Sequence, residues 1–234
     1  MAQDKIILYT NHICPWAHRA HIALAELNLP FEEVIIDLDT PRSPEYLKIN
    51  PRGLVPALSY NGEIITESAI VAQFLADAHP SHLVPASNAP GGALRRARIA
   101  FFVDTYVTKV NSTLYSIFGA LNDEEKRKEI AQKVLTAIAT EIEPLLADAS
   151  PFFGGSEKPT LAEVLTGSMV IRLPAYYKAG LIPSAVYASL PEKAPNFVKW
   201  SEAVTAHPSV NSIYDEDKLL ARFKARFAAA AAST

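Results

Sequence analysis

Cys14 is the single cysteine of this 234-residue chain, and its neighbours favour a reactive thiol. Pro15 follows it, and proline is common at the first position of a helix because the amide that it lacks is not needed there. Cys14 therefore lies at the N-terminus of a predicted helix, where free amides and the helix dipole lower a cysteine pKa from about 8.5 to roughly 3.5–7.5. The alternative is an inert buried cysteine.

The motif around this thiol also limits its chemistry. A thioredoxin-like redox site has a second cysteine at the fourth position of the motif, where this chain has Ala17. One cysteine cannot form an internal disulfide, so any disulfide made at Cys14 must be resolved by a thiol from solution. Because glutathione is the abundant thiol of the cytosol, the residues indicate glutathione as the cofactor.

The first eighty residues alternate between strand and helix patterns. Residues 5–9 are predicted to form a buried strand, residues 16–27 a helix with one apolar face, and residues 31–38 a second buried strand. A strand, a helix and a strand in this order form a right-handed crossover with parallel strands. We therefore expect the beginning of an α/β sheet.

A hairpin and a helix complete the first half. Residues 55–60 and 63–66 are separated by an Asn-Gly pair, the strongest short hairpin signal. Ser68 is predicted to cap the next helix, which has Ile70 on its apolar face and stops at Pro80. The expected order of elements is βαβ followed by ββα.

The composition changes between residues 81 and 92, which are rich in Pro, Gly, Ser and Asn and predict a linker between domains. The predicted domains are residues 1–80 and residues 93–234, and the second shows helical patterns without a convincing strand. The predicted fold class is therefore an α/β domain followed by an all-α domain.

Four local signals in the second domain concern its helices. Asn122 is predicted to open a helix, and Pro144 to kink or end it. Thr160 and Glu163 form a capping-box pattern with a structural role. Residues 228–232 form an alanine-rich tail, which we expect to be a fraying helix end.

Charge and hydropathy exclude two classes of partner. The net charge of −3 removes the usual driving force for binding nucleic acid, and no stretch has the ~20 apolar residues that cross a bilayer. A strand pattern follows the first residues directly, without the apolar core of a signal peptide. We expect a cytoplasmic protein that binds small molecules.

The ordered motifs together resemble the cytosolic glutathione transferases over essentially the full chain. They are CPWA at 14–17, NPRGLVPAL at 50–58, the Glu67-Ser68 pair and the helical second half. CPWA resembles the cysteine-type classes, chiefly omega, and CPWAHR at 14–19 is similar to the motif of glutathionyl-hydroquinone reductases. The resemblance implies a thioredoxin-like first domain, a second domain that forms the acceptor site, and a homodimer.

The resemblance also implies roles for individual residues. Cys14 would face the glutathione sulfur and form a mixed disulfide with it. Val55 would precede a cis bond to Pro56 and pair its backbone with the cysteinyl part of glutathione. Glu67 would bind the ammonium of the γ-glutamyl end, and Ser68 its carboxylate.

Two assignments stay open within this resemblance. Arg42 lies near the position of a lysine that reaches the glycyl carboxylate in omega-type enzymes, but the alignment is ambiguous with Ser43. Tyr9 lies where tyrosine-type members stabilise the glutathione thiolate, so it is the rival of Cys14. His12 and His18 flank the thiol and are expected to be bystanders.

The acceptor site of the family lies between the two domains. The candidates for its lining are Trp16, Phe102, Tyr106, Tyr115 and Tyr176, although aromatic residues at helical spacing are more often part of a core. The acceptor is expected to be a small hydrophobic electrophile or a glutathione conjugate.

The thiol favours one reaction over its alternatives. With Cys14 as catalytic residue, we predict thiol transfer or reductive removal of glutathione from a conjugate. One alternative is conjugation of glutathione to an electrophile, or a glutathione-dependent isomerisation, in detoxification or specialised metabolism. The other is a glutathione-binding module without catalysis.

Overall fold

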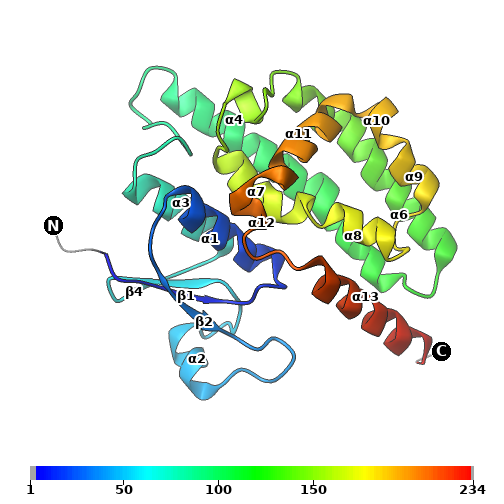
Figure 1. The fold of residues 1–234 in the computed structure, drawn as a ribbon, viewed down its shortest axis with the longest axis horizontal. Coiled ribbons are helices and arrows are strands. Elements are labelled where there is room, and N and C mark those ends of the chain that lie inside the picture. Colours follow the sequence, from blue (N-terminus) through cyan, green and yellow to red (C-terminus); the bar gives the residue numbers. More distant parts are fainter. Residues whose placement is uncertain (1–3, 233–234) are drawn as a thin grey trace.

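The computed structural model describes residues 4–232, and its first half is a four-stranded sheet with helices on both faces (Figure 1). Its elements are β1 (Ile6–Thr10), α1 (Pro15–Glu26), β2 (Glu32–Ile35), α2 (Pro44–Ile49), β3 (Ala57–Tyr60), β4 (Glu63–Thr66) and α3 (Ser68–Ala78). Helices α1 and α3 cover one face of the sheet, and α2 lies on the other (Figure 1). This is the predicted thioredoxin-like βαβ-ββα arrangement, with the short helix α2 added where only a proline-rich connection was expected.

The strand order is β2-β1-β3-β4, with β1 parallel to β2 and antiparallel to β3. The crossover and the hairpin are therefore confirmed. The prediction that the second strand is buried is wrong: β2 is at the edge of the sheet, and Ile35 is 55% exposed. An apolar run alone does not distinguish an inner strand from an edge strand.

The start of α3 also differs from the prediction. Glu67 occupies the N-cap position, and Ser68 is the first helical residue. Val71 and Leu75 are fully buried, whereas Ile70 is 57% exposed and lies outside the apolar face. The shift by one residue turns the Ser68 side chain into the structure, where it is buried.

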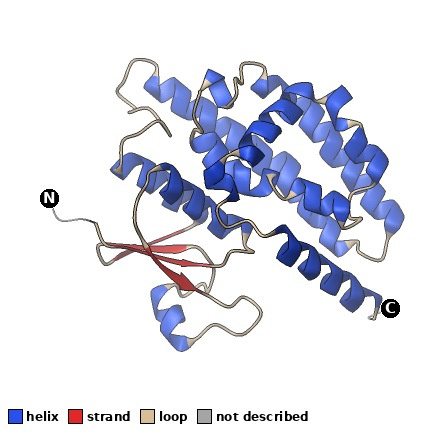
Figure 2. Cartoon of the chain, in the orientation of Figure 1, coloured by secondary structure: helices blue, strands red, loops and turns tan. Residues whose placement is uncertain are grey.

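The second half of the described chain is helical (Figure 2). Its α-helices are α4 (Gly92–Thr105), α5 (Ser112–Tyr115), α6 (Glu124–Ala137), α7 (Leu161–Val170), α8 (Leu173–Lys178), α9 (Ser184–Ala188), α10 (Leu190–Lys193), α11 (Pro195–Ala206), α12 (Pro208–Asn211) and α13 (Glu216–Ala231). Short π and 3-10 segments are η1 (Tyr106–Asn111), η2 (Ser116–Gly119), η3 (Ile138–Ile142), η4 (Glu143–Leu146) and η5 (Phe153–Gly155). Within residues 4–232 this half has no strand, only an isolated bridge between Phe152 and Ser156.

The helix signals of this half were close to correct. Asp123, not Asn122, caps α6, and it accepts a hydrogen bond from the Lys126 amide. Asn122 instead donates to the carbonyl of Ala230, which fastens the C-terminal end of α13. The α-helix gives way to π and 3-10 turns around Pro144, as expected.

Helix α7 is buried along its whole length and is the centre of the helical half. The capping box of Thr160 and Glu163 is confirmed, and the Glu163 carboxylate also accepts bonds from the Phe153 amide and the Trp200 indole, at 2.8 and 2.7 Å. Helix α1 packs directly on α7, so the two halves share one apolar core.

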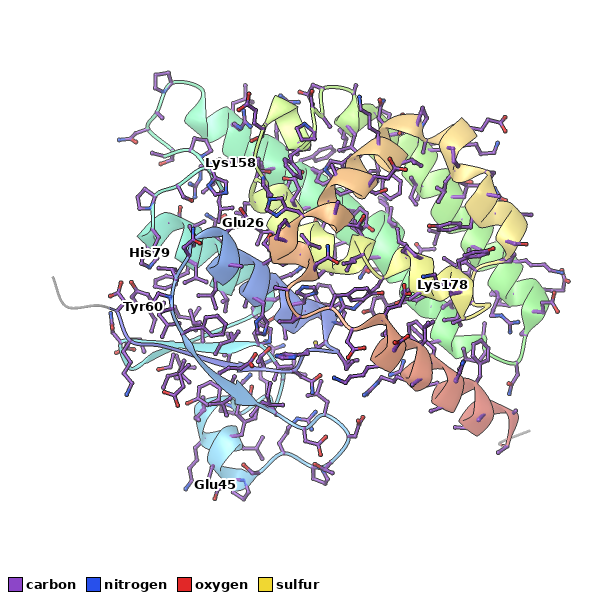
Figure 3. The ribbon with its side chains drawn as sticks, viewed as in Figure 1. Glu26, Glu45, Tyr60, His79, Lys158 and Lys178 are labelled. Carbon is purple, nitrogen blue, oxygen red and sulfur yellow. The ribbon has the colours of Figure 1, made fainter. Side chains whose placement is uncertain are left out.

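A second link between the halves is Glu26, at the end of α1 (Figure 3). Its carboxylate lies 2.9 Å from His82, in the segment between α3 and α4, and 3.1 Å from His207, between α11 and α12. The segment between α3 and α4, residues 79–91, contains no helix or strand.

None of the helices in the described part of the chain is long and apolar enough to span a membrane.

Candidate active site

Cys14 is the N-cap residue of α1, in an extended backbone conformation. Asn11 shapes the loop before it: its carbonyl accepts from the Cys14 amide, and its side chain bonds the Ile13 amide and the Ile36 carbonyl. The loop therefore places the thiol at the N-terminus of α1, as predicted.

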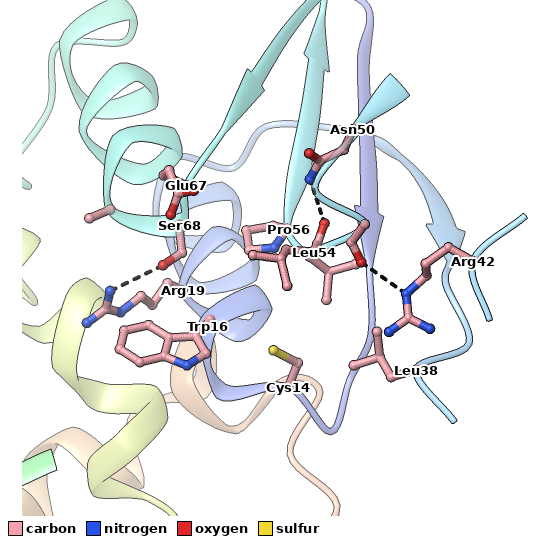
Figure 4. A pocket seen from close by; sticks show the side chains of 13 residues that line it. Cys14, Trp16, Arg19, Leu38, Arg42, Asn50, Leu54, Pro56, Glu67 and Ser68 are labelled. Atoms are coloured by element: carbon pink, nitrogen blue, oxygen red, sulfur yellow. Dashed lines mark hydrogen bonds between the residues drawn. The ribbon is translucent and has the colours of Figure 1, made fainter. Parts of the chain in front are cut away.

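A cavity of about 500 Å³ opens in front of the thiol. Figure 4 shows the Cys14 sulfur between Trp16 and Leu38, facing Pro56. The lining residues are Cys14, Trp16, Arg19, Leu38, Arg42, Asn50, Gly53, Leu54, Val55, Pro56, Glu67, Ser68 and Ala69. The structure thus brings together Cys14 and all five residues predicted to bind the cofactor.

The Val55–Pro56 peptide bond is cis, as expected. The turn before it is held by Asn50 and Tyr46, whose side chains both donate to the carbonyl of Leu54. These two bonds fix the turn that presents Val55 to the cavity.

Glu67 and Ser68 lie beside Pro56, on the side of the cavity away from Arg42 (Figure 4). Glu67 has a φ of 68°, a region that few residues other than glycine occupy and that is frequent at functional sites. Its carboxylate forms an ion pair with the exposed side chain of Arg52. The Ser68 hydroxyl accepts a hydrogen bond from Arg19 at 3.2 Å.

Arg19 is a lining residue that the sequence analysis missed. Its side chain is buried, and its guanidinium lies 4.5 Å from the centre of the Trp16 ring. Burial lowers the pKa of Arg19 to about 10, so it stays a cation at neutral pH. In the described part of the chain no carboxylate pairs with it. The spacing of three residues from Trp16, which places both on one face of α1, was the available signal.

Arg42 and Ser43 lie in different surroundings. Arg42 lines the cavity and donates to the carbonyls of Gly53, Asp37 and Thr40. Ser43 is the N-cap of α2, where its hydroxyl accepts from the Tyr46 amide, and it is not in the lining. The geometry therefore favours Arg42.

The other residues near the thiol lie outside the cavity. Tyr9 packs against Tyr46, with ring centres 5.8 Å apart, and is absent from the lining. His12 contacts Glu33 at 2.7 Å. His18 is buried against Arg172 and kept neutral, because burial lowers its pKa well below the ordinary value.

A second cavity, of about 200 Å³, meets the first at Cys14 and lies between the two halves. It is lined by Ile13, Cys14, Pro15, Trp16, Leu38, Tyr115, Phe118, Arg172, Tyr176, Leu219, Arg222, Phe223 and Arg226. Three of the five aromatic candidates line this cavity. Phe102 and Tyr106 do not: both are buried in the core, where Phe102 packs on Phe153 and Trp200.

The expected low pKa of Cys14 is not found. Burial raises the pKa of the thiol above its ordinary value, and this effect outweighs the bonds from the Ala17 and Trp16 amides and the charges of Arg172 and Arg222, which lower it. The helix N-terminus does favour the thiolate as predicted, but the sulfur lies too deep between the cavities for that effect to dominate.

A thioredoxin-like domain whose cis-proline turn faces a helix N-terminal cysteine, joined to a helical half that supplies a second cavity, defines a glutathione-dependent enzyme of the transferase type. Residues 13–78 match the family described as glutathione S-transferase, N-terminal domain. Over 237 residues the chain is 30% identical to a probable glutathione S-transferase of Nicotiana tabacum, covering 100% of this chain and 98% of the relative. The chain belongs to the glutathione S-transferase family, so it is an enzyme and its cofactor is glutathione.

Two further relatives come from different branches of this family. A maleylacetoacetate isomerase of Rhizobium meliloti is 28% identical over 166 residues, covering 69% of this chain and 78% of that protein. The crystal structure of glutathione transferase Omega 1C from Trametes versicolor superposes with a TM-score of 0.81 at 27% identity, covering 96% of this chain and 97% of that one.

Proposed function

We propose that the enzyme uses Cys14 for glutathione-dependent thiol transfer, including the reductive removal of glutathione from a conjugate. The observation that supports this proposal is the position of the sulfur, which lines both cavities and lies at the N-terminus of α1. The similarity to an omega transferase is consistent with it.

The reaction has two exchange steps at sulfur. The Cys14 thiolate attacks the sulfur of the glutathionyl group, a bond forms between the two sulfurs, and the carbon–sulfur bond breaks with its electron pair leaving on carbon. That carbon takes a proton and departs as the reduced product. A second glutathione then attacks the mixed disulfide, which releases oxidised glutathione and restores the Cys14 thiolate.

The walls of the first cavity supply the binding groups for glutathione in this proposal. The γ-glutamyl carboxylate binds the Ser68 hydroxyl and the first amides of α3, beside the Arg19 cation, and Glu67 binds the ammonium. Arg42 binds the glycyl carboxylate, and the backbone of Val55 pairs with the cysteinyl unit. Residues 1–80 form the glutathione-binding domain, residues 81–92 the linker, and residues 93–234 the domain of the acceptor site. The first three and last two of these residues lie outside the described part of the chain.

Conjugation of glutathione to an electrophile, or a glutathione-dependent isomerisation, is the second candidate. The raised pKa of Cys14 favours it, because a thiol that stays protonated at neutral pH is a poor nucleophile but can still donate a hydrogen bond to a glutathione thiolate. The similarity to a maleylacetoacetate isomerase points the same way.

The experiment that tests the proposal is the intact mass of the purified protein after incubation with oxidised glutathione. We expect a gain of one glutathione, located on Cys14 and removed by reduced glutathione. A protein whose mass stays unchanged at neutral and mildly alkaline pH would contradict thiol transfer and leave conjugation as the function.

We further propose a cytoplasmic homodimer in which the first domain of one subunit packs against the helices of the other. Large apolar side chains are exposed on both surfaces: Ile64 and Ile70 on the first domain, and Leu94 and Phe101 on α4. Size-exclusion chromatography with light scattering should give twice the chain mass, and a monomer mass at micromolar concentration would contradict the dimer.

A further inference from the structure

The second cavity has an unusual balance of charge. Of its thirteen described lining residues, three are arginines, namely Arg172, Arg222 and Arg226, and none is acidic. A concave site lined by one sign of charge between apolar walls concentrates ligands of the opposite sign. The cavity should therefore select for negative charge, although the whole chain has a net charge of −3.

Arg172 is the buried member of this set, with a relative exposure of 4%. It donates to the Ser168 and His12 carbonyls and contacts His18, so its described partners are neutral, and its Nε atom has no partner. An arginine stays protonated in proteins, so this is a buried cation without a carboxylate partner among residues 4–232. Such a cation is stabilised when an anion binds beside it.

Arg226 is exposed at the mouth of the cavity, with its guanidinium 4.9 Å from the centre of the Phe118 ring. No acidic side chain in the described chain forms an ion pair with it. Arg222 differs, because both of its terminal nitrogens contact the carboxylate of Asp39, at 2.8 and 3.1 Å. Arg172 and Arg226 therefore have no carboxylate partner among the described residues, and the charge of Arg222 is partly neutralised by Asp39.

The rest of the cavity wall suits a flat ring. Phe118, Tyr176 and Phe223 pack on one another with ring centres 5.1–5.8 Å apart, and Tyr115 lies 6.0 Å from Phe118. Aromatic groups stack favourably on such surfaces and on guanidinium planes.

We infer that the acceptor is an aromatic anion, a ring with a carboxylate or an equivalent negative group, which stacks on these aromatic side chains and places its charge between Arg172 and Arg226. This inference rests on the proposed function only in taking the second cavity as the acceptor site. It adds a substrate class, because it selects charged aromatic acceptors over neutral ones of the same shape.

The test is a comparison by isothermal titration calorimetry of two ligands of nearly the same shape, the anionic naphthalene-2-carboxylate and the neutral naphthalene-2-carboxamide. Saturating S-methylglutathione is present throughout, so that Arg19 and Arg42 of the first cavity are occupied. We expect the carboxylate to bind about tenfold more tightly, the difference between a charge-assisted and a neutral hydrogen bond. Equal affinities, or tighter binding of the amide, would overturn the inference.

Two variants locate the effect. Arg226→Gln should reduce the preference for the carboxylate about two- to fivefold, as for an exposed ion pair. Asp39→Asn releases the charge of Arg222 and should increase the preference by a similar factor. The matched control is Lys224→Gln, an equal change of charge on the exposed side of α13, which should leave the preference unchanged.

The outcomes separate this inference from the proposed reaction. If Lys224→Gln and Arg226→Gln reduce the preference equally, the effect is one of total charge and the inference is wrong. Because neither ligand reacts with Cys14, a protein that forms no glutathione adduct contradicts thiol transfer but leaves the binding comparison fully informative.

Discussion

At the scale of single residues, replacing the sulfur of Cys14 by oxygen distinguishes the two candidate reactions. Replacement of Cys14 by Ser should reduce thiol transfer by at least about a hundredfold, because a serine hydroxyl cannot form a mixed disulfide. Conjugation should persist or rise. Both rates are measured with the same purified variant.

The matched control is Tyr9→Phe, which removes the rival hydroxyl without changing either cavity. It should leave both activities close to those of the unmodified enzyme. If Tyr9→Phe abolishes conjugation while Cys14→Ser is fully active in both assays, the thiol has no role and tyrosine is the catalytic residue.

The raised pKa of Cys14 leads to a second prediction at this scale. A thiol with a raised pKa stays protonated through the neutral range, so its alkylation by iodoacetamide should accelerate about tenfold per pH unit. The rate should still be climbing at about pH 9, above the ordinary cysteine pKa of roughly 8.5. Since the chain has one cysteine, mass spectrometry counts a single label, with free glutathione as the reference. A plateau near pH 7 would show a thiolate instead.

The motifs shared with the glutathione transferases were sufficient to predict six of the residues that gather at the first cavity, but not the ionisation of Cys14. The motifs fix positions along the chain, and the fold turns those positions toward one space. The pKa of Cys14 depends on the burial of its sulfur, to which segments far apart in the sequence contribute. Arg19 was missed for a related reason, since a charged residue in a helix is ordinarily expected on its exposed side.

At the scale of elements, the start of α7 depends on one buried side chain, that of Glu163. Glu163→Gln should lower the free energy of unfolding by about 2–4 kcal/mol. The Glu163 carboxylate accepts hydrogen bonds from buried N–H groups, and in the variant one of its oxygens is replaced by an amide nitrogen, which cannot accept them. Urea denaturation followed by circular dichroism measures this loss. Glu157→Gln, an exposed change of the same type just before the helix, should cost less than about 0.5 kcal/mol.

The capping signals show how far element boundaries follow from sequence. The capping box that begins at Thr160 was predicted correctly, because it requires two suitable side chains three residues apart and this spacing fixes where the helix starts. Asn122 and Ser68 were each one residue away from the true cap, because Asp123 and Glu67 stood next to them and the local pattern does not rank the neighbours. β2 was predicted to be a buried strand because its sequence contains an apolar run. Its position at the edge depends on the order of strands across the sheet, which the run does not determine.

At the scale of the whole molecule, buried histidines couple folding to pH. Burial lowers the pKa of His21 to about 4, so the folded state disfavours its charged form. The contribution of neutral His21 to the free energy of unfolding is complete above the unfolded pKa of about 6.5 and is lost as pH falls toward 4. The loss between pH 6.5 and pH 5 is about 1.5 kcal/mol. Urea denaturation at these two pH values should show a smaller difference in His21→Gln than in the unmodified protein. His79→Gln, at a partly exposed position, should retain the full difference.

The division into a sheet half and a helical half could be predicted because strand and helix periodicities change at one place in the chain. The packing of α1 on α7 could not be predicted, because the sequence of neither helix indicates which helix it contacts. That contact, together with Glu26 between His82 and His207, makes the two halves share a core, and it creates the space in which the second cavity forms.

The meeting of both cavities at one sulfur has a kinetic consequence. In a thiol-transfer cycle the reduced product must leave before a second glutathione can approach the mixed disulfide, because Cys14 is the nucleophile of the first step and the leaving group of the second. The enzyme then alternates between a free and a glutathionylated form, and initial-rate plots at several fixed concentrations of glutathione should be parallel lines rather than a converging set.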